Sequence, residues 1–253
     1  MMQATATIEA RGANDIAEKS PVPSRPVQWR RAGRALRALT LQQGNVLDAT
    51  YSVVDAMGGM CEERLFQKFR KTPEGLRLLA ERPDLPRLLT DHQQLVALPE
   101  GTLGRIFAEV CIGAGINSMA LVEAQRNMSR DYAKLDPARQ WFSDRLTVLH
   151  DLWHILSGYA TQPRGEAAIV AFSYAQGLDY RPIPIFMALS VVMRVARVGE
   201  LWRAYRRGRR TESLVLQRYE ELLALPLETV RERLHIPAGP AWHGPRPGAG
   251  LLA

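Results

Sequence analysis

Residues Val148–Glu166 read V-L-H-D-L-W-H-I-L-S-G-Y-A-T-Q-P-R-G-E, and this stretch decides the fold class. When residues 144–158 are placed on a helix at about 100° per residue, apolar side chains surround most of the cylinder. The exceptions recur at spacings of three and four and therefore share one face: Thr147, His150, Asp151, His154 and Gly158. A helix that is apolar nearly all round is a buried helix. The stretch thus predicts a long helix inside a helical core.

Capping residues mark where this helix and the next one begin and end. Asp136 is a typical N-cap, Pro137 suits the first helical position, and Gly158 suits the end of the helix. Gly177 closes the following helix in the same way. These signals predict a helix at about residues 137–156, a loop at 159–164 and a second helix at 165–176.

The rest of the chain also has helical periodicity, so the predicted fold class is all-α. The sequence contains no convincing alternating strand, internal repeat or glycine-rich phosphate loop. Further helices are expected at residues 31–42, 62–69, 75–81, 86–92, 103–113 and 182–207, and two more open at 211–213 and 225–228.

Length and composition fit a single compact multi-helix domain with two disordered tails. A chain of 253 residues, 46% of them hydrophobic, can bury a sizeable core. Pro21, Pro23 and Pro26 interrupt the beginning of the chain, and a Pro/Gly-rich run follows Ile236. We expect a flexible tail at residues 1–30, a helical domain at 31–237 and a Pro/Gly-rich tail at 238–253.

The cysteines and the first residues indicate a cytoplasmic protein. Cys61 and Cys111 lie far apart, in no disulfide or thiolate-zinc pattern, which suits a reducing compartment. Residues 1–30 contain three acidic residues and no continuous apolar segment, unlike an export signal. The longest apolar run, at 183–193, is well short of the roughly 20 residues of a membrane-spanning helix, so we expect no bilayer crossing.

The polar face of the buried helix indicates a metal site. Burying two imidazoles and a carboxylate without partners is costly, so they must meet something polar. Glu166 adds a fourth group in the first turn of the next helix, where the helix dipole favours its ionised form. If two antiparallel helices bring these faces together, His150, Asp151, His154 and Glu166 form a nitrogen and oxygen donor set that suits zinc, manganese or iron. The structural alternative is a hydrogen-bonded histidine pair without a metal.

Two other metal motifs match this stretch less well. An H-E-x-x-H protease needs a glutamate directly after the first histidine, where this chain has Asp151. HD-type phosphohydrolases also carry a His-Asp pair and need a further histidine and a later aspartate. His92 and Asp179 are the candidates, but His92 lies in a polar segment. The phosphohydrolase is therefore a distant alternative.

The spacing H-D-x-x-H, eleven residues, then E resembles the signature of the ubiquinone (coenzyme Q) biosynthesis protein 4 family. G-E-A-A-I-V-A-F-S-Y-A-Q at 165–176 extends the resemblance. It continues outward through R-P-D-L at 82–85, L-P-E-G-T-L-G at 98–104 and L-P-L-E-T-V-R-E-R-L-H-I-P at 225–237. The resemblance thus covers about residues 50–237.

The resemblance implies an all-helical fold and a divalent metal, usually zinc, bound by His150, Asp151, His154 and Glu166. It also implies a role in ubiquinone biosynthesis: decarboxylation coupled to hydroxylation at the carboxyl-bearing ring carbon of a prenylated 4-hydroxybenzoate. If only three residues bind the metal, Asp151 or Glu166 could act as acid or base. The alternative is a non-catalytic scaffold with a structural metal, which binds prenylated lipid and organises other biosynthetic enzymes at the membrane.

Four residues near the polar face are candidates for substrate contacts or for orienting the metal ligands: Tyr159, Ser173, Tyr174 and Gln176. Each of them could equally be a packing residue.

The apolar segment from Ile183 to Trp202 ends in a basic cluster and resembles an amphipathic helix at an anionic bilayer surface. Its expected lipid contacts are Arg194, Arg197, Arg203, Arg206 and Arg207. A core helix with a solvated basic end is the structural alternative. The net charge of +7 agrees with anionic partners, but the cluster lacks the interleaved aromatics of nucleic-acid binding. We expect a protein peripheral on the inner face of the membrane, with a prenylated aromatic substrate, other ubiquinone-biosynthesis enzymes and a second copy of the chain as partners.

Overall fold

The computed structural model describes residues 26–40, 52–53, 56, 62–129, 131–178 and 182–239. Most of the two predicted tails lies outside these residues. Within them the fold is all-α, as predicted, and the only β-type pairing is an isolated bridge between Thr102 and Pro226.

The helices of the first half of the chain are α2 (Trp29–Thr40), α4 (Glu62–Phe69), α5 (Pro73–Glu81), α6 (Leu85–Thr90), α7 (His92–Val96), α8 (Leu103–Ala114) and α9 (Ser118–Met128). The second half contains α10 (Pro137–Ser157), α11 (Pro163–Ala175), α12 (Pro182–Val192), α13 (Val198–Arg210), α14 (Tyr219–Leu222) and α15 (Leu227–Arg233). Two short 3-10 turns, Tyr132–Lys134 and Leu214–Leu216, join some of them.

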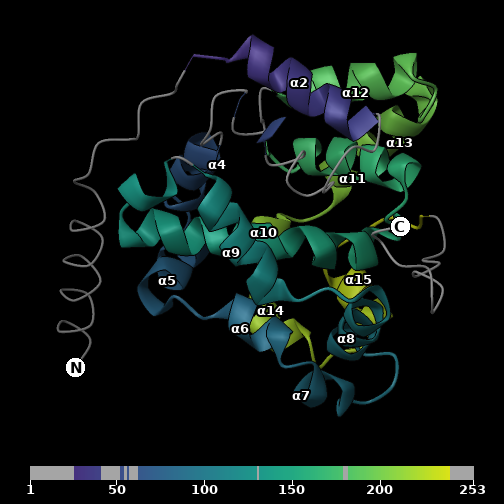
Figure 1. The fold of residues 1–253 in the computed structure, drawn as a ribbon. Coiled ribbons are helices and arrows are strands. Elements are labelled where there is room, and N and C mark those ends of the chain that lie inside the picture. The colour runs from purple at the N-terminus through teal and green to yellow at the C-terminus, as the bar shows by residue number, and fades with distance from the viewer. Residues whose placement is uncertain are drawn as a thin grey trace.

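Helix α10 is the central element, and α11 to α13 lie on one side of it with α5 to α8 on the other (Figure 1). Its ends are those that the capping signals predict. The Asp136 carboxylate accepts hydrogen bonds from the backbone N–H groups of Ala138 and Arg139, which are 2.9 and 3.0 Å away. At the other end, Gly158 has a φ of 76° and donates its N–H to the carbonyl of His154.

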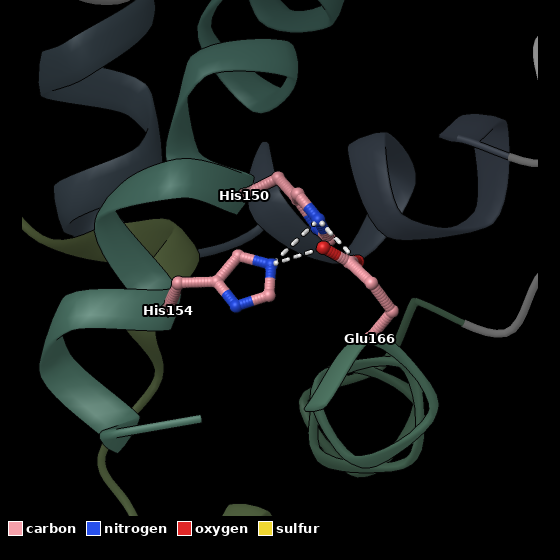
Figure 2. Close-up of side chains that lie close together, drawn as sticks. All are labelled: His150, His154 and Glu166. Atoms are coloured by element: carbon pink, nitrogen blue, oxygen red, sulfur yellow. Dashed lines mark hydrogen bonds and ion pairs between the residues drawn. The ribbon is translucent and has the colours of Figure 1, made fainter. Parts of the chain in front are cut away.

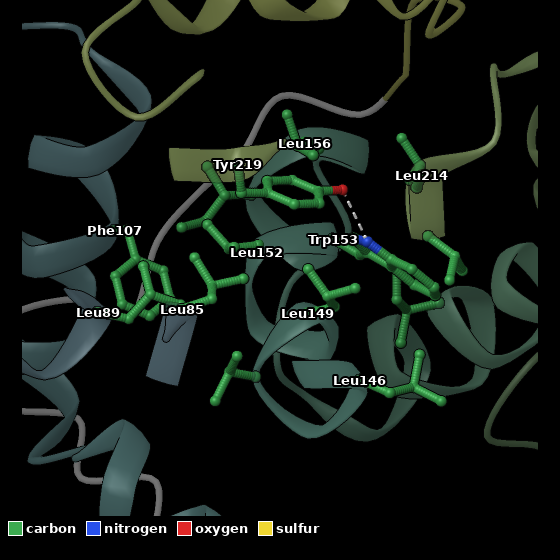
Figure 3. Close-up of a cluster of buried hydrophobic side chains, with 14 of the residues drawn as sticks. Leu85, Leu89, Phe107, Leu146, Leu149, Leu152, Trp153, Leu156, Leu214 and Tyr219 are labelled. Atoms are coloured by element: carbon green, nitrogen blue, oxygen red, sulfur yellow. Dashed lines mark hydrogen bonds between the residues drawn. The ribbon is translucent and has the colours of Figure 1, made fainter. Parts of the chain in front are cut away.

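Most of α10 is buried, as its apolar circumference predicts (Figure 3). Leu149, Leu152 and Trp153 are each 1% exposed or less, and burying each contributes about 1.5–3 kcal/mol. The indole N–H of Trp153 donates to the hydroxyl of Tyr219 over 3.0 Å, so the polar atom of each large side chain is satisfied inside the core.

Helix α11 packs closely on α13 because a glycine lies at the contact. A Cβ on Gly208 would overlap the carbonyl oxygen of Phe172 and lie 2.8 Å from the Cβ of Ala175. The two helices run in the same direction, since Arg164 near the start of α11 pairs with Glu200 near the start of α13. This packing fixes the helix that carries Glu166.

The prediction of one long helix at 182–207 is wrong. The chain breaks between α12 and α13, where Arg194 has a left-handed φ of 59°. The Glu200 carboxylate accepts a hydrogen bond from the backbone N–H of Arg197 over 3.1 Å, which caps the start of α13. The run I-P-I-F-M-A-L-S-V-V-M contains no glycine or proline near this break. A prediction based on apolar periodicity alone therefore extends one helix across the break.

Two smaller predictions also need correction, and sequence reasoning missed one helix. The segment at 86–92 forms parts of two short helices, α6 and α7, because Asp91 caps a new start. Helix α9 was not predicted, although Asn117 is a clear N-cap whose side chain accepts from the N–H of Ala120. The helix expected to open at 211–213 is only the 3-10 turn Leu214–Leu216.

No single helix among the described residues is long and apolar enough to cross a membrane. Helices α8 and α9 reach the necessary length and composition only as a pair, and they are bent by 68° where they meet.

Candidate metal centre

Three of the four predicted ligands come together between α10 and α11. His150 and His154 project from successive turns of α10, and Glu166 reaches them from the first turn of α11 (Figure 2). The two Nε2 atoms are 3.1 Å apart, and the Glu166 carboxylate oxygens lie 3.4 Å from His150 Nε2 and 3.3 Å from His154 Nε2. One donor atom of each residue lies within 4.8 Å of the others.

These separations fit a bound divalent ion. Zinc binds imidazole nitrogen and carboxylate oxygen at about 2.0–2.1 Å, and tetrahedral angles then place the donor atoms about 3.3 Å from one another. The two Nε2 atoms, 3.1 Å apart, agree with this value. The carboxylate contacts of 3.4 and 3.3 Å are made by two different oxygens, Oε2 to His150 and Oε1 to His154. With one oxygen as the donor, the three donor atoms lie within 4.8 Å of one another, so a small side-chain movement would bring them round one ion. Two histidines and one carboxylate with a free fourth position are also a donor set of catalytic zinc sites.

The second ring nitrogen of His154 supports the same conclusion. Its Nδ1 lies 2.9 Å from the backbone carbonyl oxygen of Tyr159. A carbonyl accepts hydrogen bonds and does not donate them, so Nδ1 carries a proton. In the neutral imidazole that binds metals, the lone pair of Nε2 then faces His150 and Glu166. Metal-binding histidines are usually oriented by such a contact.

The electrostatics of the three residues favour a charged carboxylate. Burial by itself would raise the pKa of Glu166, but the charges and hydrogen bonds of His154 and His150 outweigh burial and hold this pKa well below its usual value. Burial likewise would lower the pKa of His150, but the hydrogen bond and charge of Glu166 outweigh it, and the pKa of His150 is raised. Glu166 therefore carries a negative charge beside the two imidazoles, and a metal ion that binds here must displace the proton that this charge favours on His150.

The site is open on one side. The His154 side chain is only 2% exposed, whereas His150 is 43% and Glu166 35% exposed. The site is therefore accessible to solvent from the side of His150 and Glu166 and closed on the side of His154.

A glycine allows the loop after α10 to return so close to α11. A Cβ on Gly165 would overlap the carbonyl oxygen of Ala160 and lie 2.7 Å from its carbonyl carbon. The backbone of the 159–162 loop therefore lies against the first turn of α11. This contact places Glu166, the next residue, opposite His150 and His154.

Asp151, the fourth predicted ligand, is not in the group of three. It lines a small cavity of about 20 Å³ on α10, together with His154, Phe107 and Cys111. Its Oδ2 is buried without a hydrogen-bond partner in the structure, and burial raises its pKa despite the opposing charges of His150 and His154. Burial also raises the pKa of the Cys111 thiol, which does not favour a thiolate ligand.

The other predicted contacts have mixed outcomes. Tyr159 is next to the site through its carbonyl group, which accepts from His154. The hydroxyl of Ser173 is buried without a partner, and the Tyr174 ring packs at 6.3 Å from the ring of Tyr205. Gln176 is structural, since its amide bonds the carbonyl groups of Gly208 and Thr211 and the N–H of Leu214.

The five arginines predicted at a lipid surface divide into two kinds. Four are exposed: Arg194, Arg197, Arg203 and Arg206. Arg207 instead points inward, where it donates hydrogen bonds to the carbonyl oxygens of Ser157 and Pro237 and lies over the ring of Tyr159. Its guanidinium is therefore not positioned for contact with a lipid.

Of the two further residues that an HD-type phosphohydrolase would use, the structure describes only His92. His92 begins the separate helix α7 and does not belong to the group of His150, His154 and Glu166. Asp179 lies outside the described residues.

Sequence reasoning missed the residues that hold the end of α10. Besides Arg207, Arg231 donates hydrogen bonds to the backbone carbonyl oxygens of Leu156 and Ile155, which are 3.0 and 2.8 Å away. Arg231 is one of two arginines in L-P-L-E-T-V-R-E-R-L-H-I-P, and no local signal distinguishes it from Arg233. Its contact is formed by segments far apart in the sequence.

Comparisons with known proteins find relatives that are named for ubiquinone biosynthesis. A protein from Danio rerio named "Ubiquinone biosynthesis protein COQ4 homolog, mitochondrial" is 28% identical over 183 residues, which cover 70% of this chain and 65% of the relative. A Rattus norvegicus protein of the same name is 27% identical over 227 residues, covering 87% of this chain and 82% of the relative. The similar "Ubiquinone biosynthesis protein coq4, mitochondrial" of Botryotinia fuckeliana is 27% identical over 180 residues, covering 68% and 61%.

The chain thus spans less than two thirds of the length of the Danio and Botryotinia relatives. All three relatives are named mitochondrial, and the cytoplasmic location expected for this chain stays a prediction. The sequence model of the family described as "Coenzyme Q (ubiquinone) biosynthesis protein Coq4" matches residues 32–240, which is most of the chain and includes all three converging side chains. This chain therefore belongs to the coenzyme Q biosynthesis protein Coq4 family.

Proposed function

We propose that this chain acts in ubiquinone biosynthesis as a metal-dependent decarboxylase of a prenylated 4-hydroxybenzoate. The observation that carries the proposal is the cluster of His150, His154 and Glu166, whose donor atoms lie within 4.8 Å of one another at a site that is open on one side. Membership of the Coq4 family and the names of the relatives support the pathway.

In the proposed reaction, the bond between the ring carbon and its carboxyl carbon breaks, carbon dioxide leaves, and a hydroxyl takes its place. This is a two-electron oxidation. Dioxygen as the acceptor, reduced to hydrogen peroxide, and water as the source of the hydroxyl balance its atoms and electrons.

His150, His154 and Glu166 would hold the ion, which we take to be zinc, with manganese or iron as alternatives. When bound, such an ion can hold a substrate carboxylate or phenolate oxygen and stabilise the negative charge that develops in the ring. The Tyr159 carbonyl keeps the His154 ring in the required tautomer. The exposed edges of His150 and Glu166 face the side from which the substrate ring approaches.

Asp151 has two possible roles, and a conservative substitution separates them. As a fourth ligand it would have to turn from its cavity toward His150, and Asp151→Asn would then lose the metal. As an acid or base it would remain in the cavity beside His154, and Asp151→Asn would keep the metal but lose turnover. The observed position, outside the group of three, favours the acid or base role.

The test incubates metal-loaded protein with a prenylated 4-hydroxybenzoate and oxygen and follows the release of the ring carboxyl as carbon dioxide. Wild type should release it, and Glu166→Ala should not. If neither protein releases carbon dioxide while both bind the prenylated compound equally, the decarboxylase proposal is wrong. The non-catalytic scaffold with a structural metal is then the better account.

A surface around the break between α12 and α13 supports attachment to a membrane, for the enzyme and for the scaffold alike. Large apolar side chains are exposed there, among them Val192 at 78%, Val198 at 67% and Trp202 at 58%. The exposed Arg194 and Arg197 lie between them in the chain. Apolar side chains surrounded by arginines suit insertion at an anionic bilayer surface. This short turn replaces the long flat helix of the sequence prediction.

Binding to phosphatidylcholine vesicles with and without phosphatidylglycerol tests this surface. Val192→Glu should abolish sedimentation with the anionic vesicles. Ile112→Glu is the matched control, because Ile112 is 57% exposed but lies on α8. Equal loss in both variants would contradict a specific surface. Contacts with other biosynthetic enzymes and with a second copy of the chain remain predictions.

A further inference from the structure

The carboxyl end of α10, the helix with both metal-site histidines, is held by two arginines from distant parts of the chain. Arg207 of α13 donates to the Ser157 carbonyl oxygen from both terminal nitrogens, each over 3.0 Å. Arg231 of α15 bonds the two preceding carbonyl groups. These carbonyls have no partner within the helix and lie at the negative end of its dipole, so guanidinium groups are suitable caps.

Arg207 also contacts the turn that leaves this helix. Its guanidinium carbon lies 5.0 Å from the centre of the Tyr159 ring, a cation–π contact. The same side chain donates to the carbonyl of Pro237, over 2.8 Å from Nη2 and 3.2 Å from Nε. Arg207 therefore contacts both ends of the turn, Ser157 and Tyr159. Its hydrogen bonds to the Pro237 carbonyl hold the guanidinium in this position.

The backbone of this turn is part of the metal centre. Gly158 adopts a left-handed φ of 76°, which turns the chain back so that the Tyr159 carbonyl reaches Nδ1 of His154 over 2.9 Å. That contact determines which ring nitrogen of His154 is protonated and in which direction Nε2 points. A movement of the turn would release this ring.

We propose that Arg207 is a positioning residue for the metal centre, which acts on His154 through Ser157 and the Tyr159 carbonyl. The inference rests on the metal site of the proposed function. It assigns Arg207 a role different from the lipid contact that its position in a basic cluster predicts. Arg231 holds the helix end but does not touch the turn, so its effect on His154 should be smaller.

The simplest alternative is that Arg207 only stabilises the fold by capping α10. A cap of this kind would lower the stability of the metal-free and metal-loaded protein equally and leave the metal affinity unchanged. A positioning residue must also change the affinity, because contacts that orient a ligand typically account for ten- to hundredfold in metal binding.

The experiment measures zinc affinity of the full chain by competition with a chromophoric chelator, and records the visible spectrum of the cobalt-substituted protein. Arg207→Ala should weaken zinc binding at least tenfold and alter the cobalt spectrum. Arg207→Lys keeps the charge but not the paired donors, so its zinc affinity should lie between those of Arg207→Ala and wild type. Arg209→Ala is the matched control, since Arg209 is an exposed arginine of the same helix, and it should behave as wild type.

The outcomes separate the two claims. Wild type without zinc binding would overturn the metal centre itself and this inference with it. Zinc binding by wild type and by Arg207→Ala with equal affinity would overturn only the inference, whatever the change in stability. If Arg207→Ala does not fold, Tyr159→Leu removes the ring contact but keeps the carbonyl, and it should show the same effect to a smaller degree. An unchanged affinity in that variant would count against the role of Arg207.

Discussion

Replacing Gly165 by alanine should disturb both the stability of this protein and the proposed metal centre. The new Cβ would overlap the carbonyl oxygen of Ala160 and lie 2.7 Å from its carbonyl carbon. Carbon atoms in contact are ordinarily about 3.5–4.0 Å apart, so the loop and α11 must separate by about 1 Å. Gly165 is not among the residues with positive φ, so alanine has no conformational conflict and the effect is steric.

Two consequences follow from this separation. Overpacking against rigid backbone should reduce the free energy of unfolding by about 1–3 kcal/mol. Glu166 is the next residue, and its carboxylate should move by a similar distance. Since metal–ligand distances tolerate only about 0.2 Å, a shift of about 1 Å should weaken zinc binding by tenfold or more.

Urea denaturation and a competitive zinc titration measure these two effects. Gly113→Ala is the matched control, because Gly113 lies in the last turn of α8 with no atom within 4 Å of a new Cβ. That variant should be as stable as wild type or slightly more so, by up to about 0.5–1 kcal/mol. If Gly165→Ala unfolds at the wild-type urea concentration and binds zinc with wild-type affinity, the close contact between the loop and α11 cannot be what places Glu166.

Other changes give distinct expected results. Purified wild type should contain about one divalent ion per chain and His154→Ala none, measured by elemental analysis; equal contents would eliminate the site. Asp151→Asn should retain the ion, because its carboxylate lies outside the group of three donors, and a metal-free variant would instead make Asp151 a ligand. Burial would raise the pKa of Glu63, but the hydrogen bonds from Arg139 and Gln67 outweigh it and lower the pKa below 4.5. The stability from that charge is therefore present above pH 4.5 and lost as the pH falls through the lowered pKa. Glu63→Gln should cost about 1–3 kcal/mol at neutral pH and make urea unfolding less sensitive to acid, and an unchanged acid sensitivity would contradict the lowered pKa. Arg194→Ala should weaken binding to anionic vesicles about fivefold, the equivalent of about 1 kcal/mol per arginine, and high salt should remove the difference.

The fold could be predicted best where local chemistry determines it. Asp136, Pro137 and Gly158 mark the limits of α10 through their own hydrogen bonds and backbone preferences, and the structure has these limits. The break at Arg194 could not be predicted, because it depends on the capping by Glu200 and on packing of α13 against α11 rather than on a helix-breaking residue.

In the candidate site, too, the residues placed by local spacing could be predicted and those placed by distant contacts could not. Spacing on one helix places His150 and His154 together, and a short glycine-containing loop returns Glu166 to them. Asp151 lies on the same face, but its side chain lines the small cavity beside Phe107 and Cys111 instead of joining the group of three, which periodicity cannot resolve. The sequence predicts a lipid contact for Arg207 because a basic cluster does not reveal that one of its members points inward. The contacts of Arg207 to Ser157 and Pro237 join segments that are 50 and 30 residues apart in the sequence.

The unequal exposure of the three side chains has a consequence for how the site exchanges its ion. A chelator in solution can reach only the half formed by His150 and Glu166, because the side chain of His154 is only 2% exposed. An ion leaving the site would therefore break its two outer bonds first and remain attached to His154 alone, from which the outer ligands can recapture it. Removal by a bulky chelator should consequently be slow compared with removal by a small one, even where their affinities for zinc are equal.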